Sequence, residues 1–229
     1  MSAPAVGPAA PATRRRRPDP SVSQAATVNS VAFVVSVALS FFITPFIIRT
    51  LGDARYGTWS LIAQVTGYYG LLDFGVRHAV AYYAASLLAT EDDEDVSRLV
   101  SSAFWGLTGV ALLVLALGAV LMTYFPTWFE TAGVESGEIR GAIVIVSMTI
   151  ALTLPFDVFG AVVNGCRRPD ILSGLDVVLR IVTSGLIVLV LYQGGGLVAL
   201  AGVQFGGKIA TWLILSIVAR HYVPALSLN

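Results

Sequence analysis

The side chains in this chain that could do chemistry are a few charged and polar groups inside long apolar stretches. Asp176 and Arg180 are four residues apart, so on a helix they share one face and can pair. Lys208 has no carboxylate near it within its own apolar stretch. A charge inside a membrane span costs about 2.5–3.5 kcal/mol on insertion scales, so it should face protein, a water-filled cavity or a ligand. We therefore interpret Arg180 and Lys208 as a cavity wall for an anionic substrate. A neutralised Asp176–Arg180 pair that fixes helix packing is the alternative.

A second group of polar residues could serve ion coupling or polar helix packing. Asp157 lies inside an apolar stretch, and Asn164 follows two turns later on the same helical face. Either residue could take part in ion or proton coupling, and so could Asp176. A polar contact between helices explains the same residues, and both interpretations remain open.

Two further arginines lie near the expected span ends. Arg77 is spaced to pair with Asp73, and Arg49 stands at the end of the first apolar stretch. Snorkelling of Arg49 to the lipid headgroups is the simplest structural explanation for it. The chain shows no Ser-His-Asp set, no metal triad and no cysteine nucleophile, so we predict neither an enzyme nor a metal or cofactor site.

Composition limits the class of protein. Of 229 residues, 56% are hydrophobic and only 12% are charged, against roughly 25% charged in ordinary soluble domains. Fourteen basic residues balance fourteen acidic ones, whereas nucleic-acid binders carry a basic surplus. These figures exclude a soluble globular enzyme, a disordered chain and a nucleic-acid binder.

The apolar residues form stretches long enough for membrane helices, which need about 20 residues each. None shows the strict alternation of a membrane β-barrel. We predict an all-α, polytopic membrane bundle of six transmembrane helices within residues 28–220. The expected spans are 28–48, 56–72, 99–129, 141–163, 171–192 and 197–219.

Shorter segments connect these spans. Residues 71–88 are expected to include an amphipathic helix at the inner surface, and residues 193–196 a short outer turn. Gly202 and Gly206 form a GxxxG pair, which favours close helix packing.

Arginine positions predict the orientation. Residues 1–27 hold five prolines and four consecutive arginines at 14–17, which is typical of a disordered basic tail. With that tail in the cytoplasm, nine arginines lie inside and three outside. We therefore expect a cytoplasmic-membrane protein with both termini in the cytoplasm. Residues 221–229 would begin a cytoplasmic loop between two lobes.

Three motifs resemble a known family. They are Thr-Pro-Phe-Ile-Ile-Arg-Thr-Leu-Gly-Asp-Ala-Arg-Tyr-Gly-Thr-Trp at 44–59, Gly-Leu-Leu-Asp-Phe-Gly-Val at 70–76 and Gly-Cys-Arg-Arg-Pro-Asp at 165–170. Together they are similar to the polysaccharide-biosynthesis flippases of the multidrug/oligosaccharidyl-lipid/polysaccharide exporter superfamily. The resemblance covers residues 28–226.

The resemblance implies a transporter that flips a polyprenyl-diphosphate-linked oligosaccharide by alternating access. Such proteins have two lobes around a central cavity, where basic residues meet the diphosphate. Carried over by position, these residues are Arg180 and Lys208, with Arg77 and Arg49 as secondary candidates. Only one lobe is expected here, so a second lobe or partner subunit joins the lipid bilayer and the lipid-linked sugar as predicted partners. We expect no transport from this lobe alone.

Two other functions fit the same sequence. A cation-coupled multidrug exporter lobe needs an essential carboxylate in its spans, for which Asp157 is the candidate. A non-transporting membrane scaffold of a glycan-assembly complex would tolerate the loss of Arg180 and Lys208.

Overall fold

The computed structural model describes residues 22–68, 75–89, 93–129, 133–166 and 169–222, and within them the chain is helical and contains no strand. This confirms the predicted all-α class. The described helices are α1 (Val22–Leu51), α2 (Asp53–Gly67), α3 (Val76–Ala89), α4 (Asp93–Trp128), α5 (Ser136–Gly165), α6 (Pro169–Tyr192) and α7 (Leu197–Tyr222). Helix α1 begins at Val22 and so reaches six residues into the segment 1–27.

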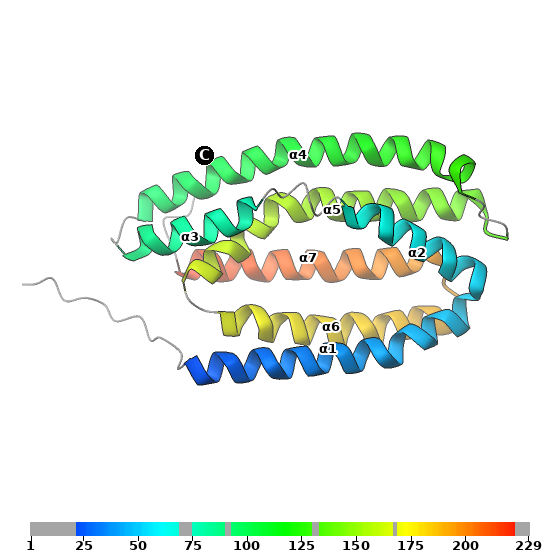
Figure 1. Cartoon of the computed structure of the whole chain (residues 1–229), viewed down its shortest axis with the longest axis horizontal. Helices are drawn as coiled ribbons and strands as arrows, with labels where there is room; N and C mark the ends of the chain where they lie inside the picture. Colours follow the sequence, from blue (N-terminus) through cyan, green and yellow to red (C-terminus); the bar gives the residue numbers. More distant parts are fainter. Residues whose placement is uncertain (1–21, 69–74, 90–92, 130–132, 167–168, 223–229) are drawn as a thin grey trace, which may run out of the picture.

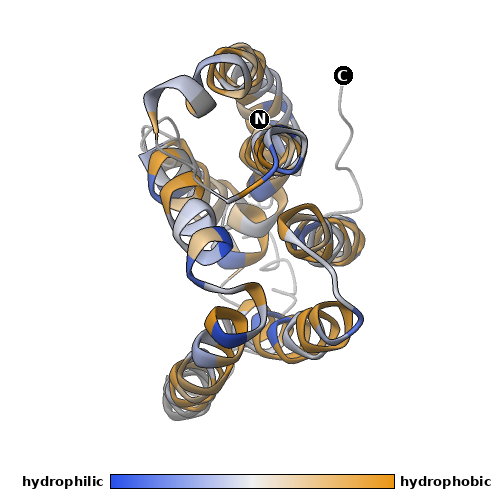
Figure 2. Ribbon diagram, turned by 90° about the vertical axis from the view of Figure 1, so that its right-hand side faces the viewer, coloured by the Kyte–Doolittle hydropathy of each residue, from blue (hydrophilic) through white to orange (hydrophobic). Residues whose placement is uncertain are grey.

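The long helices lie roughly parallel to one another and the chain runs along them in alternating directions (Figures 1 and 2). Hydrophobic residues predominate along their length in Figure 2. The first residue of α1 and the last residue of α7 lie at the same end of the bundle, on the left in Figure 1. We call this the left end, and the opposite end, where α1 meets α2, the right end.

The prediction of six transmembrane helices is wrong in its count. Among the described residues, five helical segments are long and apolar enough to cross a membrane: Ser30–Leu51, Asp95–Phe125, Ser136–Gly165, Ile171–Tyr192 and Leu197–His221. The expected second span, 56–72, is not one of them: its described helix, α2, has only 15 residues, and residues 69–72 lie outside the described part of the chain. At 1.5 Å per residue α2 extends roughly 22 Å, short of a hydrocarbon core of about 30 Å.

Two short helices lie in this part of the chain, α2 at the expected second span and α3 after it. Helix α2 runs from the right end toward the middle of the bundle, and α3 continues from the middle to the left end (Figure 1). Both contact α5. Hydropathy measures how apolar a segment is and does not show how long its helix is, so it did not reveal that α2 has only 15 residues.

Helix α3 packs within the bundle, although the sequence predicted an amphipathic helix at the membrane surface. It contacts α4 and α5, and its Val80 and Ala84 are fully buried. Gly165 at the end of α5 permits this approach, because a Cβ there would lie 3.1 Å from the carbonyl oxygen of Ala81. The small and β-branched residues of α3 therefore pack against other helices.

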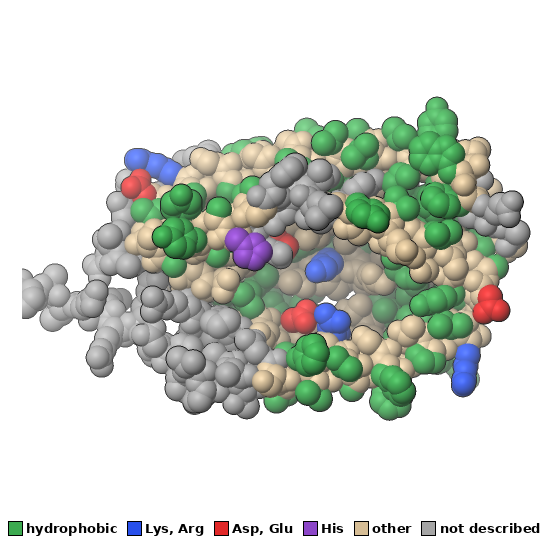
Figure 3. Space-filling model, in the orientation of Figure 1, with side chains coloured by type: hydrophobic (Ala, Val, Ile, Leu, Met, Phe, Trp, Pro, Cys, Tyr) green, Lys and Arg blue, Asp and Glu red, His purple; other side chains and the backbone are tan. Residues whose placement is uncertain are grey.

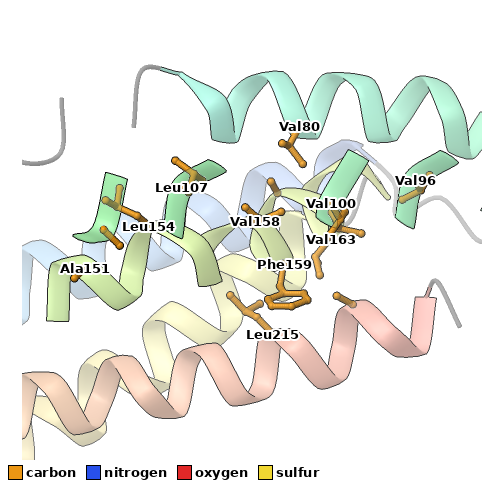
Figure 4. Close-up of a cluster of buried hydrophobic side chains, with 14 of the residues drawn as sticks. Val80, Val96, Val100, Leu107, Ala151, Leu154, Val158, Phe159, Val163 and Leu215 are labelled. Carbon is orange, nitrogen blue, oxygen red and sulfur yellow. The ribbon is translucent and has the colours of Figure 1, made fainter. Parts of the chain in front are cut away.

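Two hydrophobic clusters hold the bundle together. The left cluster joins α3, α4, α5 and α7, and its members include Val80, Val100, Val158, Phe159 and Leu215 (Figure 4). The right cluster joins α1, α2, α4, α5, α6 and α7. Among the described residues, α1 contributes none to the left cluster. Helix α1 is thus anchored at its right end and packs along α6 for the rest of its length.

Glycine positions refine the packing. The predicted GxxxG contact is wrong, because a Cβ added at Gly202 or Gly206 would meet nothing within 4 Å. Close approach occurs instead at Gly118, where an added Cβ would overlap the side chain of Ser147 on the neighbouring helix. The predicted short turn after α6 is confirmed, with Gly194 at φ +85°.

Candidate functional site: a polar cavity among four helices

A cavity of about 410 Å³ lies between α1, α5, α6 and α7. Its volume falls in the range typical of small-molecule sites. Figure 3 shows acidic and basic side chains in a hollow in the middle of one face of the molecule. The cavity is lined by Leu39, Ser40, Ile43, Thr44, Thr149, Asp176, Leu179, Arg180, Thr183, Ser184, Ile187, Gln204, Gly207, Lys208 and Thr211.

The charged part of this wall lies near the middle of the bundle. Arg180 is eleven residues from the start of α6, and Lys208 is eleven residues from the start of α7. These helices start at opposite ends of the bundle (Figure 1), so each charge lies roughly 16 Å from an end. A substrate group held here would be well away from both membrane surfaces.

Asp176 and Arg180 form the predicted pair. The Nε of Arg180 lies 3.5 Å from Oδ2 of Asp176, and the two side chains are 45% and 60% exposed respectively. Both groups thus face the open cavity and keep hydrogen-bonding capacity. The geometry fits a cation whose charge is partly balanced and which can still bind a ligand.

Lys208 has a different environment. Its side chain is exposed in the cavity, and no hydrogen bond or ion pair joins it to another described residue. Because the ammonium group is a donor with no acceptor, its partners must be water or a ligand. Together with the Asp176–Arg180 pair, it gives this cavity wall a formal charge of +1.

The structure separates the other predicted site residues from the cavity. Arg49 is exposed at the right end of α1. Asp157 is half-buried and Asn164 is exposed on α5, and neither lines the cavity. Arg77 belongs to the first turn of α3, but its side chain is outside the part of the structure that is described, as is Asp73.

Sequence reasoning missed the hydroxyl groups of the wall. Ser40 and Thr44 are four residues apart on α1, while α7 presents Gln204, Lys208 and Thr211 at i, i+4 and i+7. This spacing places polar side chains on one face of an apolar helix. The same spacing of polar residues is present in the sequence and is the signal that predicts this wall.

A second polar network ties helix ends together at the right end. Arg55 Nε donates to Glu138 Oε2 at 3.1 Å, and the backbone N–H of Leu197 donates to Glu138 Oε1 at 2.7 Å. A Cβ at Gly196 would overlap the Glu138 carboxylate, so the glycine leaves room for that side chain where it lies. One carboxylate on α5 therefore joins the starts of α2 and α7. Among the described residues, His, Cys, Asp and Glu side chains form no group suited to a metal ion.

Comparison with known proteins gives one relative. No family model matches the chain, and no solved structure matches it. The chain is 25% identical over 156 residues to EpsK of Bacillus subtilis (strain 168), which is described as an uncharacterized membrane protein. The match covers 68% of this chain and 31% of the relative. Together with the five candidate spans, this likeness identifies a multi-pass helical membrane protein.

Proposed function

We propose that this chain forms one lobe of a flippase that moves a polyprenyl-diphosphate-linked oligosaccharide across the cytoplasmic membrane for polysaccharide biosynthesis. The observation that carries the proposal is the convergence of Arg180 and Lys208 on one polar cavity midway along an apolar bundle. A diphosphate needs cationic donors, and arginine offers a planar fork of them. The motifs at 44–59, 70–76 and 165–170 support the same function.

The two cations have complementary roles in this proposal. Lys208 meets the diphosphate as an unpaired point charge, since no described residue bonds to it. Arg180 offers donors beyond the one directed at Asp176. Asp176 lowers the net charge of the cavity and so limits how tightly the anion is held. A transporter needs that limit, because its substrate must leave as well as enter.

The apolar tail of the substrate requires an apolar surface beside this cavity. Helix α1 contributes Ser40 and Thr44 to the cavity wall, while its Val37, Phe41 and Phe42 are exposed. The headgroup then lies between α1 and α7, and the polyprenyl chain lies along the outside of α1 in the bilayer. Helix α1 thus lies between the polar headgroup of the substrate and its apolar polyprenyl chain.

A binding measurement tests the proposal on the full chain in detergent. Geranylgeranyl diphosphate serves as the probe and geranylgeraniol as the uncharged comparison. We expect the protein to bind the diphosphate and not the alcohol, and the Arg180→Gln/Lys208→Gln double variant to lose roughly tenfold or more in affinity. Arg140→Gln, an exposed arginine at the start of α5, is the matched control and should bind normally. Equal binding of both probes would contradict the proposal.

A second experiment separates transport from scaffolding in cells. Arg180→Leu/Lys208→Leu should abolish glycan export in a strain that depends on this protein. A scaffold role predicts normal export from the same variant. Immunoblotting of membrane fractions must show unchanged protein levels for the comparison to count.

A further inference from the structure

The threonines of this protein fall into two classes by how their hydroxyl groups are bonded. Among threonines whose side chains the structure describes, eight donate to a backbone carbonyl three or four residues earlier. These are Thr50, Thr58, Thr108, Thr123, Thr127, Thr149, Thr153 and Thr211. The two exceptions, Thr44 and Thr183, make no such bond and both line the cavity.

The difference has a physical reason. A hydroxyl surrounded by hydrocarbon or packed protein has no water to bond with, so a helical threonine donates to its own helix. A hydroxyl that leaves this bond unmade must have partners elsewhere. For Thr44 and Thr183 that place is the cavity, since both lie on its wall, one on α1 and the other on α6.

Three more neutral side chains line the cavity without a hydrogen bond to the protein part that the structure describes. Ser40, Ser184 and Gln204 line the cavity, and none is hydrogen-bonded to another described residue. With Thr44 and Thr183 they form a set of five, which we call the neutral polar wall. It comes from α1, α6 and α7 and surrounds the same space as Arg180 and Lys208.

The chemistry of the neutral polar wall differs from that of the cations. Arginine and lysine only donate hydrogen bonds, which suits a diphosphate. A hydroxyl or a side-chain amide also accepts them. A fully ionised phosphate offers no proton to these acceptors, whereas every hydroxyl of a sugar does. The acceptors therefore point to a polyhydroxyl ligand beside the anion.

Gly207 connects the two parts of the cavity. A Cβ at this position would lie 2.5 Å from Thr183 Oγ1, so the glycine allows the Thr183 side chain to rest against α7. The next residue of α7 is Lys208. Thr183 of α6 and Lys208 of α7 thus line the same cavity, which suits a ligand that joins a sugar to a phosphate.

We propose that the neutral polar wall binds the sugar ring attached to the diphosphate, with Thr44 and Thr183 as specificity-determining residues for a glycosylated headgroup. This inference rests on the proposed function, because it places the sugar beside the diphosphate held by Arg180 and Lys208. Water fills the same positions when no sugar is bound. Sugar hydroxyls replace that water and reproduce its hydrogen bonds.

The test compares two probes and two pairs of substitutions in the full chain. The probes are geranylgeranyl diphosphate and the same lipid carrying one N-acetylglucosamine on its diphosphate. The wild-type protein should bind the glycosylated probe roughly fivefold or more tightly, the gain expected from a few net hydrogen bonds. Thr44→Val/Thr183→Val should erase that preference and leave affinity for the unglycosylated probe unchanged.

Thr149→Val/Thr211→Val is the matched control. These two threonines line the same cavity, but their hydroxyl protons are already donated to the carbonyl oxygens of Ile145 and Gly207, so they can accept from a sugar but cannot donate to it. The control pair should therefore keep more of the sugar preference than the test pair does. Thr44→Ser/Thr183→Ser restores a hydroxyl at each tested position and should keep it as well, which guards against a valine variant that fails to fold.

The outcomes separate the two proposals. If the wild-type protein binds both probes equally, the wall holds water only and the inference is overturned, while the diphosphate site stands. If the test pair and the control pair lose the preference to the same extent, Thr44 and Thr183 have no special role and the inference is again overturned. If neither probe binds, both proposals fail.

Discussion

At the scale of single residues, Asp176 decides how strongly the cavity attracts anions. Its carboxylate lies 3.5 Å from Arg180 in a partly exposed position. Ion pairs of this kind contribute about 0.2–1 kcal/mol, because water screens them. The pair is therefore weak enough for a phosphate to compete for the guanidinium.

The first prediction concerns this competition. The negative charge of Asp176 balances Arg180 and also repels an anionic ligand. Asp176→Asn removes that charge, so geranylgeranyl diphosphate should bind roughly two- to fivefold more tightly. Titration of the purified protein measures the change. Asp95→Asn is the control, since Asp95 pairs with Arg98 near the left end of α4 and away from the cavity. Weaker binding by the Asp176 variant would count against this role.

The second prediction concerns Glu138. Glu138→Ala should lower the melting temperature more than Arg55→Ala does, because Glu138 also accepts the backbone N–H of Leu197. Arg55 is 48% exposed and its ion pair is worth little, whereas Glu138 is only 14% exposed. Glu138→Gln keeps an acceptor of the same shape and should fall between wild type and Glu138→Ala. Equal melting temperatures for the alanine variants would contradict the bridging role.

At the scale of elements, α4 and α5 depend on a small residue where they meet. Gly118 of α4 lies against Ser147 of α5, which is buried. Helices approach closely where a side chain is absent, and interiors packed in this way tolerate added volume poorly.

The third prediction follows from that contact. Gly118→Ala should destabilise the protein by about 1–3 kcal/mol, the usual cost of overpacking. Gly109→Ala on the same helix is the control, because a Cβ there meets nothing within 4 Å. Alanine also has a higher helix propensity than glycine, so the control variant should be as stable as the wild-type protein or slightly more stable. Thermal unfolding in one detergent compares the three proteins.

At the scale of the whole molecule, the two ends of the bundle differ. The right end is closed by a hydrophobic cluster from six helices and by the Glu138 network. At the left end the cluster includes no residue of α1 among those described. Among the described residues, α1 is thus packed into the right cluster only, whereas α4, α5 and α7 take part in both clusters.

The fourth prediction concerns orientation. If the left end faces the cytoplasm, as the arginine distribution predicts, green fluorescent protein fused after Tyr222 should fluoresce. Alkaline phosphatase inserted at Gly194, in the turn between α6 and α7, should be active because that enzyme needs the oxidising outer side. The reverse pair of results would show the opposite orientation.

The sequence by itself determined the helical class, five of the long apolar spans to within about five residues at each end, the Asp176–Arg180 pair and the turn at Gly194. Each of these depends on residues close together in the chain. Apolar runs predict membrane helices, a spacing of four residues sets a shared face, and glycine permits a positive φ.

Only the tertiary structure decided the rest. It limited the described helix at the expected second span to the 15 residues of α2, buried Val80 and Ala84 of α3, and left Gly202 and Gly206 without close neighbours. It also brought hydroxyls from four helices around Arg180 and Lys208. A cavity is a space between side chains that are far apart in sequence, so its contents depend on how the helices pack, which local hydropathy and spacing do not specify.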